Sequence, residues 1–148
     1  MEDLQQLEGW AGPLLAKLQP AARRRLARTV GTALRRSQVQ RIREQRNPDG
    51  SAYAPRKRAQ AGQIKRRADR MFQGLTRAKH FKVEASEHAV AVGFLGRVAR
   101  IARVHQEGLS DRVTAGGPTV RYERRELLGF TDAERQTILD CLIEHLAR

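Results

Sequence analysis

The sequence predicts an α+β fold with N-terminal helices, a small antiparallel sheet built on a β-hairpin, a short central helix and a C-terminal helix packed on the sheet. Three observations predict it. Apolar residues recur at helical steps near both ends of the chain and after residue 97. Apolar and polar residues alternate in residues 81–94, as in a pair of strands. The length of 148 residues fits a single domain, residues 1–148.

The first helix is expected over residues 4–18, where leucines, Trp10 and Ala11 share one side. Pro13 lies inside this pattern. Because proline lacks an amide donor and crowds the preceding turn, we expect the helix to be kinked or broken near residue 12. Pro20 suits the opening of a second helix, expected over residues 21–46.

The apolar stripe of the second helix changes side along its length. Leu26, Val30 and Leu34 share one stripe, whereas Val39 and Ile42 fall roughly opposite it. Either the helix bends in this region or its far end touches something else. The partner is a neighbouring subunit or another part of the same domain, and the sequence leaves both open.

A firm turn is expected where the second helix ends, at Asn47-Pro48-Asp49-Gly50. Proline moves its predecessor out of helical geometry, Asp49 can close a turn through its side chain, and Gly50 accepts positive φ. Residues 51–70 then read as a basic, partly flexible arm, an exposed loop with a short helix. The end of this arm is expected to be anchored to the core by Met71, Phe72 and Leu75.

In the C-terminal half, Ser86-Glu87-His88 is expected to connect the two strands of the hairpin. A helix with Val98, Ile101, Ala102 and His105 on its apolar side should end at Gly108. Residues 111–118 read as a loop, and residues 120–122 as a short third strand. Thr131 and Glu134 have capping-box spacing at the start of the last helix. The buried stripe of that helix is expected to comprise Ile138, Leu139, Leu142, Ile143 and Leu146.

The composition predicts a lean core, because aromatic residues make up only 5% of the chain. Trp10, Phe81 and Phe94 are the rings expected in it. The acidic start of the chain does not resemble a secretory signal. The longest apolar run, residues 89–95, is far shorter than the roughly 20 residues that cross a bilayer as a helix, so we expect no membrane contact. The single Cys141 is interpreted as a core residue.

The net charge of +13 is concentrated in residues 21–82, which hold 19 Lys and Arg against three acidic residues. Clustered cations attract a polyanion by releasing its counterions, so a basic protein that contacts DNA non-specifically is the alternative function. A solvated arm, or one that docks on an acidic partner, explains the same charge. The expected contact residues are Arg56, Lys57, Arg58, Lys65, Arg66, Arg67 and Arg70.

The search for catalytic chemistry yields no candidates. The four histidines lie on separate expected elements, without ligand spacing or an acidic partner, so neither a metal site nor a cofactor is expected. The glycine-rich runs lack the Lys-Ser/Thr context of phosphate loops, and no serine has a nucleophile-elbow context. His105 is interpreted as a hydrogen-bonded core histidine. The sequence therefore does not predict an enzyme.

Three runs, in order, resemble the phage tail completion (virion morphogenesis) family over nearly the whole chain. They are Arg41-Ile42-Arg43-Glu44-Gln45-Arg46-Asn47-Pro48-Asp49-Gly50 followed by Tyr53 and Pro55, then Ile101-Ala102-Arg103-Val104-His105-Gln106-Glu107-Gly108, and lastly Arg125-Glu126-Leu127-Leu128-Gly129-Phe130-Thr131. Many members carry tryptophan where this chain has Tyr53. The family spans contractile-tailed temperate phages and Mu-like phages.

The resemblance implies a structural virion protein, assembled in the bacterial host cytoplasm, that acts at the head-proximal end of the tail in tail completion and head-tail joining. It implies a ring of six copies, contacts with tail tube or tail terminator proteins and with head completion or neck proteins, and DNA passing through the ring. The motif residues would be structural. They are Pro48, Asp49, Gly50, Tyr53, Pro55, His105, Gln106, Gly108, Arg125 and Gly129.

Overall fold

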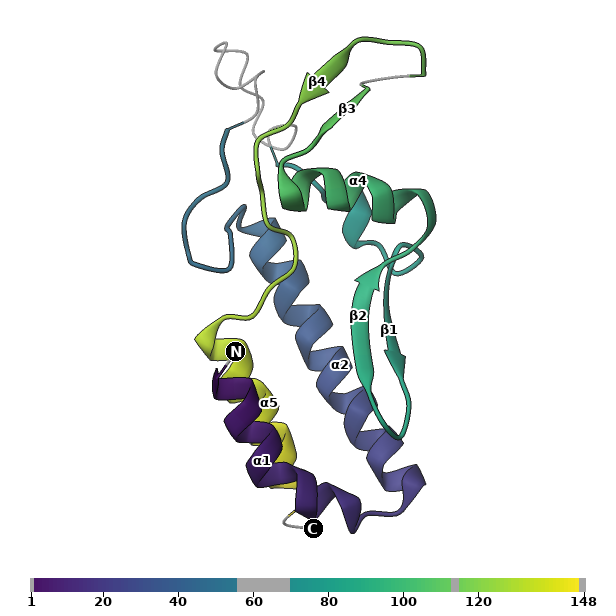
Figure 1. Cartoon of the computed structure of the whole chain (residues 1–148), viewed down its shortest axis with the longest axis vertical. Helices are drawn as coiled ribbons and strands as arrows, with labels where there is room; N and C mark the ends of the chain where they lie inside the picture. The colour runs from purple at the N-terminus through teal and green to yellow at the C-terminus, as the bar shows by residue number, and fades with distance from the viewer. Residues whose placement is uncertain (1, 56–69, 113–114, 147–148) are drawn as a thin grey trace. The chain divides into compact units, whose positions relative to one another are not determined.

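The structure, a computed structural model, describes residues 2–55, 70–112 and 115–146. Its elements are, in order, α1 (Glu2–Ala16), α2 (Pro20–Arg43), the 3-10 turn η1 (Gly74–Thr76), β1 (Phe81–Ala85), β2 (Val90–Phe94), α4 (Gly96–Glu107), β3 (Ser110–Arg112), β4 (Thr119–Arg121) and α5 (Asp132–Leu146) (Figure 1). The predicted α+β class is confirmed. In the described ranges no helix combines the length and hydropathy needed to cross a membrane.

The chain divides into two compact units, each formed by segments distant in the sequence. Unit 1 comprises Met1–Ser37, Val83–Val92 and Phe130–Arg148, and unit 2 comprises Gln38–Lys82 and Gly93–Gly129. Helix α2 and the β1–β2 hairpin therefore each contribute residues to both units. Each unit has its own hydrophobic core.

The core of unit 1 is formed by three helices and the hairpin. Helix α1 packs against α5 (Figure 1). The buried residues are Ala11, Leu26, Val30, Leu34 and Leu142, and the partly buried residues packed against them include Leu15, Leu18, Val90, Val92, Ile138 and Cys141. Burial raises the pKa of the Cys141 thiol. The C-terminal helix thus shares one core with strand β2.

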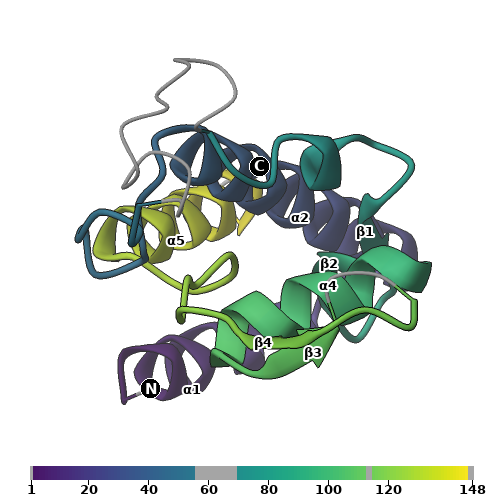
Figure 2. The ribbon, with the colours of Figure 1, turned by 90° about the horizontal axis from the view of Figure 1, so that it is seen from above.

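The start of α5 is fixed by reciprocal hydrogen bonds. The Thr131 hydroxyl accepts from the Glu134 amide at 3.1 Å, and Glu134 Oε2 accepts from the Thr131 amide at 3.1 Å. This is the predicted capping box. Glu134 is also almost fully buried, and its Oε1 accepts from the Ser37 hydroxyl of α2 at 2.9 Å. The carboxylate therefore links α5 to α2, which lie side by side in Figures 1 and 2.

The core of unit 2 includes the far end of α2. Ile42 has no exposed surface and packs with Tyr53, Met71, Ala102 and Leu127. This answers the question left open by the sequence, since Ile42 contacts another part of the same chain. Phe72, Leu75 and Phe94 pack against this cluster, which confirms the predicted anchor at the end of the basic arm. The Phe81 and Phe94 rings meet edge to face at 4.5 Å.

The strands form two separate two-stranded sheets. In the hairpin of β1 and β2, the Ser86 amide donates to the Ala89 carbonyl at 2.8 Å. The second sheet pairs β3 with β4, with Asp111 opposite Val120. The predicted loop over residues 111–118 was thus wrong at its start, and the expected third strand belongs to a sheet of its own. Ser-Asp-Arg has no apolar alternation to signal a strand, so pairing with β4 defines it.

Helix α1 continues through Pro13 to Ala16, so it is not broken near residue 12, and a kink there stays a prediction. The carbonyl that loses its donor belongs to Gly9, which is exposed and can be hydrated. Helix α2 ends at Arg43, before the expected residue 46. Gln45 adopts the left-handed conformation at φ 57°, which ends the helical path.

Three residues expected in the core are about half exposed: Trp10, Ile101 and Ile143. Each lies at the edge of an apolar stripe, beside residues that are buried. Helical periodicity gives the side of a helix but not the width of the surface that its neighbours cover. The core of unit 1 is therefore even poorer in aromatic rings than the sequence suggests.

Candidate interaction surfaces

Residues 125–129 of unit 2 have no regular secondary structure, and side chains from other segments bind their main chain. The Asn47 side-chain oxygen accepts from the Glu126 amide at 2.8 Å, and the Tyr53 hydroxyl donates to the Glu126 carbonyl at 2.9 Å. Burial is the main cause that raises the pKa of Tyr53 to about 12, so this hydroxyl remains a neutral donor. Asn47 and Tyr53, from the first of the three family runs, thereby bind the main chain of the third run.

Two glutamines continue these contacts. Gln106, near the end of α4, accepts from the Leu127 and Leu128 amides at 2.7 and 3.0 Å and donates to the Leu128 carbonyl at 2.9 Å. Gln38 of α2 accepts from the Gly129 amide at 3.2 Å and donates to the Gly129 carbonyl at 2.9 Å. A buried polar main-chain group needs a partner. The side-chain amides of Gln106 and Gln38 supply these partners to main-chain groups that are not paired with a strand in the described part of the chain.

Arg125 is buried and fixes the start of the same segment. Its Nε donates to the Ala54 carbonyl at 2.9 Å, and a terminal nitrogen donates to the Pro55 carbonyl at 3.2 Å. The Arg125 amide donates to the His105 carbonyl at 2.8 Å. We call the side chains of Gln38, Asn47, Tyr53, Gln106 and Arg125 the clamp. The clamp connects all three runs that resemble the family.

The turn at residues 47–50 has the expected form. The Gly50 amide donates to the Asn47 carbonyl at 2.9 Å, and Gly50 has φ 90°. Asp49 Oδ1 accepts from the Ser51 amide and hydroxyl, and the hydroxyl contact is the main cause that lowers the pKa of Asp49. Pro48 lies against Gly129, where an added Cβ would be 2.4 Å from the proline Cγ. Gly108 caps α4 at φ 65°.

The His105 side chain packs against two aromatic rings. Its imidazole lies between Phe72 and Tyr122, with ring centroids 4.7 and 4.8 Å away. Its Nδ1 is buried without a hydrogen-bond partner in the described part of the chain, unlike the hydrogen-bonded core histidine that the sequence suggested. Burial, with the Arg125 charge as the smaller cause, lowers the pKa of His105 to about 4. The ring is therefore neutral at neutral pH.

This environment predicts a pH dependence. The unfolded chain binds a proton on His105 below about pH 6.5, and the folded chain only near pH 4. Protonation of His105 therefore favours the unfolded state. The contribution of His105 to the free energy of unfolding is fully present above about pH 6.5 and is lost as the pH falls toward 4. Urea unfolding across this range should show wild type losing about 1 kcal/mol more than His105→Phe, a figure reduced for partial solvent screening. Parallel stability curves for the two proteins would contradict this assignment.

Most of the basic arm lies outside the described residues. Arg56, Lys57, Arg58, Lys65, Arg66 and Arg67 lie outside the described residues. Arg70 is described and exposed. That the expected contact residues act together therefore stays a prediction.

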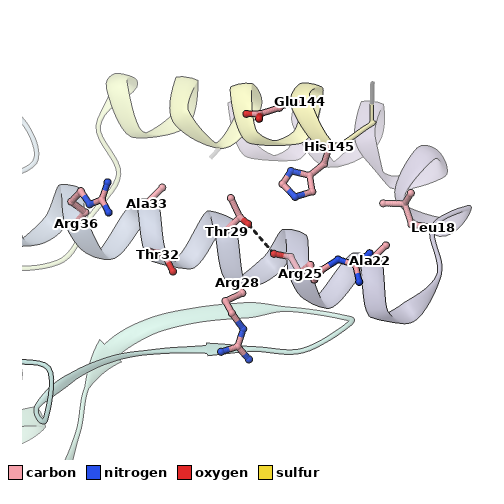
Figure 3. A pocket seen from close by; sticks show the side chains of 10 residues that line it. All are labelled: Leu18, Ala22, Arg25, Arg28, Thr29, Thr32, Ala33, Arg36, Glu144 and His145. Atoms are coloured by element: carbon pink, nitrogen blue, oxygen red, sulfur yellow. Dashed lines mark hydrogen bonds between the residues drawn. The ribbon is translucent and has the colours of Figure 1, made fainter. Parts of the chain in front are cut away.

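A second basic surface lies in unit 1, and its residues are not among the predicted contact residues. A groove of about 880 Å³ runs along α2 and α5 and is lined by Leu18, Ala22, Arg25, Arg28, Thr29, Thr32, Ala33, Arg36, Glu144 and His145 (Figure 3). We call it the arginine groove. One feature of the sequence could have indicated this basic surface: α2 contains eight arginines and no acidic residue in 24 positions.

The described residues hold no group of three or more His, Cys, Asp or Glu side chains that could bind a metal ion. The family-motif residues, all of which the structure describes, are used in packing and in main-chain hydrogen bonds. The described residues offer charged and apolar surface, in the arginine groove and at half-exposed side chains such as Trp10.

The chain belongs to the phage virion morphogenesis family, whose model matches residues 2–147. Within that class it is similar to tail completion protein S of Escherichia phage P2. The two are 35% identical over 153 aligned residues that cover the whole of both chains. No solved structure matches the chain.

Proposed function

We propose that this protein is a structural, non-catalytic component of phage tail completion, acting at the head-proximal end of the tail in head-tail joining. The observation that carries the proposal is the similarity to tail completion protein S along the full length of both chains. The clamp supports it, because the runs that mark the family are used to build a scaffold. The comparisons lend no support to the alternative, a non-specific DNA-binding role.

Such a role works through partners. We propose that copies of the protein form a ring of six in the virion neck, that the ring contacts tail tube or tail terminator proteins and head completion proteins, and that DNA passes through it. Assembly would take place in the host cytoplasm. The basic arm, including Arg70, is proposed to contact these partners or the DNA.

The test is deletion of the gene from its phage, with the protein supplied from a plasmid as the control. Electron microscopy of lysates should show filled heads and separate tails in the deletion and joined particles in the complemented culture. Infectious titre should fall by several orders of magnitude. A normal yield of infectious particles from the deletion would refute the proposed function.

A further inference from the structure

The arginine groove presents polar side chains at its exposed surface. The exposed residues of its lining are Arg25, Arg28, Thr29, Thr32, Arg36 and Glu144, whereas the leucine and both alanines of the lining are half-buried. A surface that binds another protein ordinarily has an apolar centre. No apolar residue of the described lining is exposed in that way, so the groove suits a hydrated and charged partner.

Three arginines of α2 give the groove its positive charge. The guanidinium groups of Arg25, Arg28 and Arg36 make no ion pair with the described residues. On a helix, an arginine is commonly paired with an acidic residue three or four positions away, but α2 contains no acidic residue. Because α5 contributes only the carboxylate of Glu144, the lining keeps an excess of positive charge. The partner is therefore expected to be an anion.

The three arginines are spread along the helix. Eleven positions separate Arg25 from Arg36, which amounts to about 16 Å along α2. At about 3.6 residues per turn these two residues lie on the same side of the helix, and Arg28 lies within a quarter of a turn of both (Figure 3). A single small anion cannot reach charges so far apart. An extended polyanion can contact all three.

The chemistry of the lining favours a phosphate backbone. The planar guanidinium group matches the oxygens of a phosphate with two parallel hydrogen bonds. Threonine hydroxyls, such as that of Thr32 between the arginines, are common contacts to the phosphates of DNA. The described lining contains no Phe, Tyr or Trp, the rings on which the bases of a single strand stack. These features indicate a double-stranded nucleic acid.

We infer that the arginine groove binds the phosphate backbone of duplex DNA through Arg25, Arg28 and Arg36. Contacts to the backbone carry no direct reading of the base sequence, so the binding is not specific for sequence. The site is distinct from the basic arm, which lies elsewhere in the sequence. The inference rests on the proposed function for the source of the duplex, because DNA passes the joint between head and tail in that proposal.

Fluorescence anisotropy of the full-length protein with a labelled duplex of about 20 base pairs, at several salt concentrations, tests the inference. The groove variant is Arg25→Gln with Arg28→Gln and Arg36→Gln. Because it removes three cations, the slope of log Kobs against log salt should become shallower by about 2–3, and the affinity at low salt should fall at least tenfold. Replacing the same three arginines with lysine keeps the charge and should restore most of the slope.

The matched control neutralises three arginines that are exposed outside the groove, as Arg97→Gln with Arg112→Gln and Arg121→Gln. Its net charge equals that of the groove variant. It should bind the duplex within about twofold of wild type, with a slope that changes by less than about one. The circular dichroism of both variants should match that of wild type, because all six side chains are exposed.

Equal losses in the groove variant and the control would show a general effect of charge and overturn the inference. A groove variant that binds the duplex as wild type does would also overturn it, and loss of binding to polyglutamate in that variant would assign the groove to an acidic protein. Deletion of the gene tests the proposed function separately. If the deletion blocks joining while the groove variant keeps its affinity for the duplex, the inference fails and the function stands.

Discussion

Replacing Gln106 with leucine is expected to lower the free energy of unfolding by roughly 2–4 kcal/mol. Leucine has a similar size but removes all three side-chain hydrogen bonds to Leu127 and Leu128. The Leu127 residue is fully buried, so its amide would lose its partner away from water. Urea denaturation monitored by circular dichroism measures the change.

Gln136→Leu is the matched control. Gln136 is exposed on α5, and its side chain donates to Asp140 at 2.9 Å on the same helix. An exposed pair of this kind contributes little, so this variant should stay within about 0.5 kcal/mol of wild type. If both glutamine variants lose the same small amount, the clamp does not stabilise the fold.

The second large effect is expected for Gly31→Ala, which should destabilise unit 1 by about 1–3 kcal/mol. An added Cβ would lie 2.3 Å from Val83 Cγ1 and 2.7 Å from Val90 Cγ2, both on the hairpin. Valine side chains are stiff, so the hairpin would have to shift. Val83→Ala in the same chain should recover part of the loss, as a double-mutant cycle would measure.

Gly9→Ala serves as the opposite case. Gly9 also lies inside a helix, but no atom lies within 4 Å of the position that its Cβ would take. Alanine should then stabilise the protein by up to about 1 kcal/mol through its better helix propensity. Thermal melts that shift the same way for both glycine variants would show that close packing at Gly31 has little weight.

Local patterns predicted the elements well because their signals are local. The capping box at Thr131 and Glu134, the turn at Gly50 and the cap at Gly108 each depend on residues within one or two turns. The exposure of Trp10 was not predictable in this way, since it depends on which surface of α1 other segments cover. Helical periodicity carries no such information.

The clamp was only half predictable. The sequence marked its three runs as belonging together, and Gln106 was among them. It gave no indication that Gln38 would bind both polar groups of Gly129, 91 positions away, because an amide side chain on a helix is ordinary. The arginine groove was not predicted, because the denser cluster of charge at residues 56–70 is a stronger signal than a helix without acidic residues.

The clamp hydrogen-bonds to the main chain of residues 126–129 and not to their side chains. Glu126, for example, is held through its amide by Asn47 and through its carbonyl by Tyr53. Its own side chain takes no part in these two contacts and can differ between phages, whereas Asn47 and Tyr53 are constrained by contacts that any residue except proline would make at position 126. Related phages could alter this surface to match a changing partner while the scaffold beneath it keeps its shape.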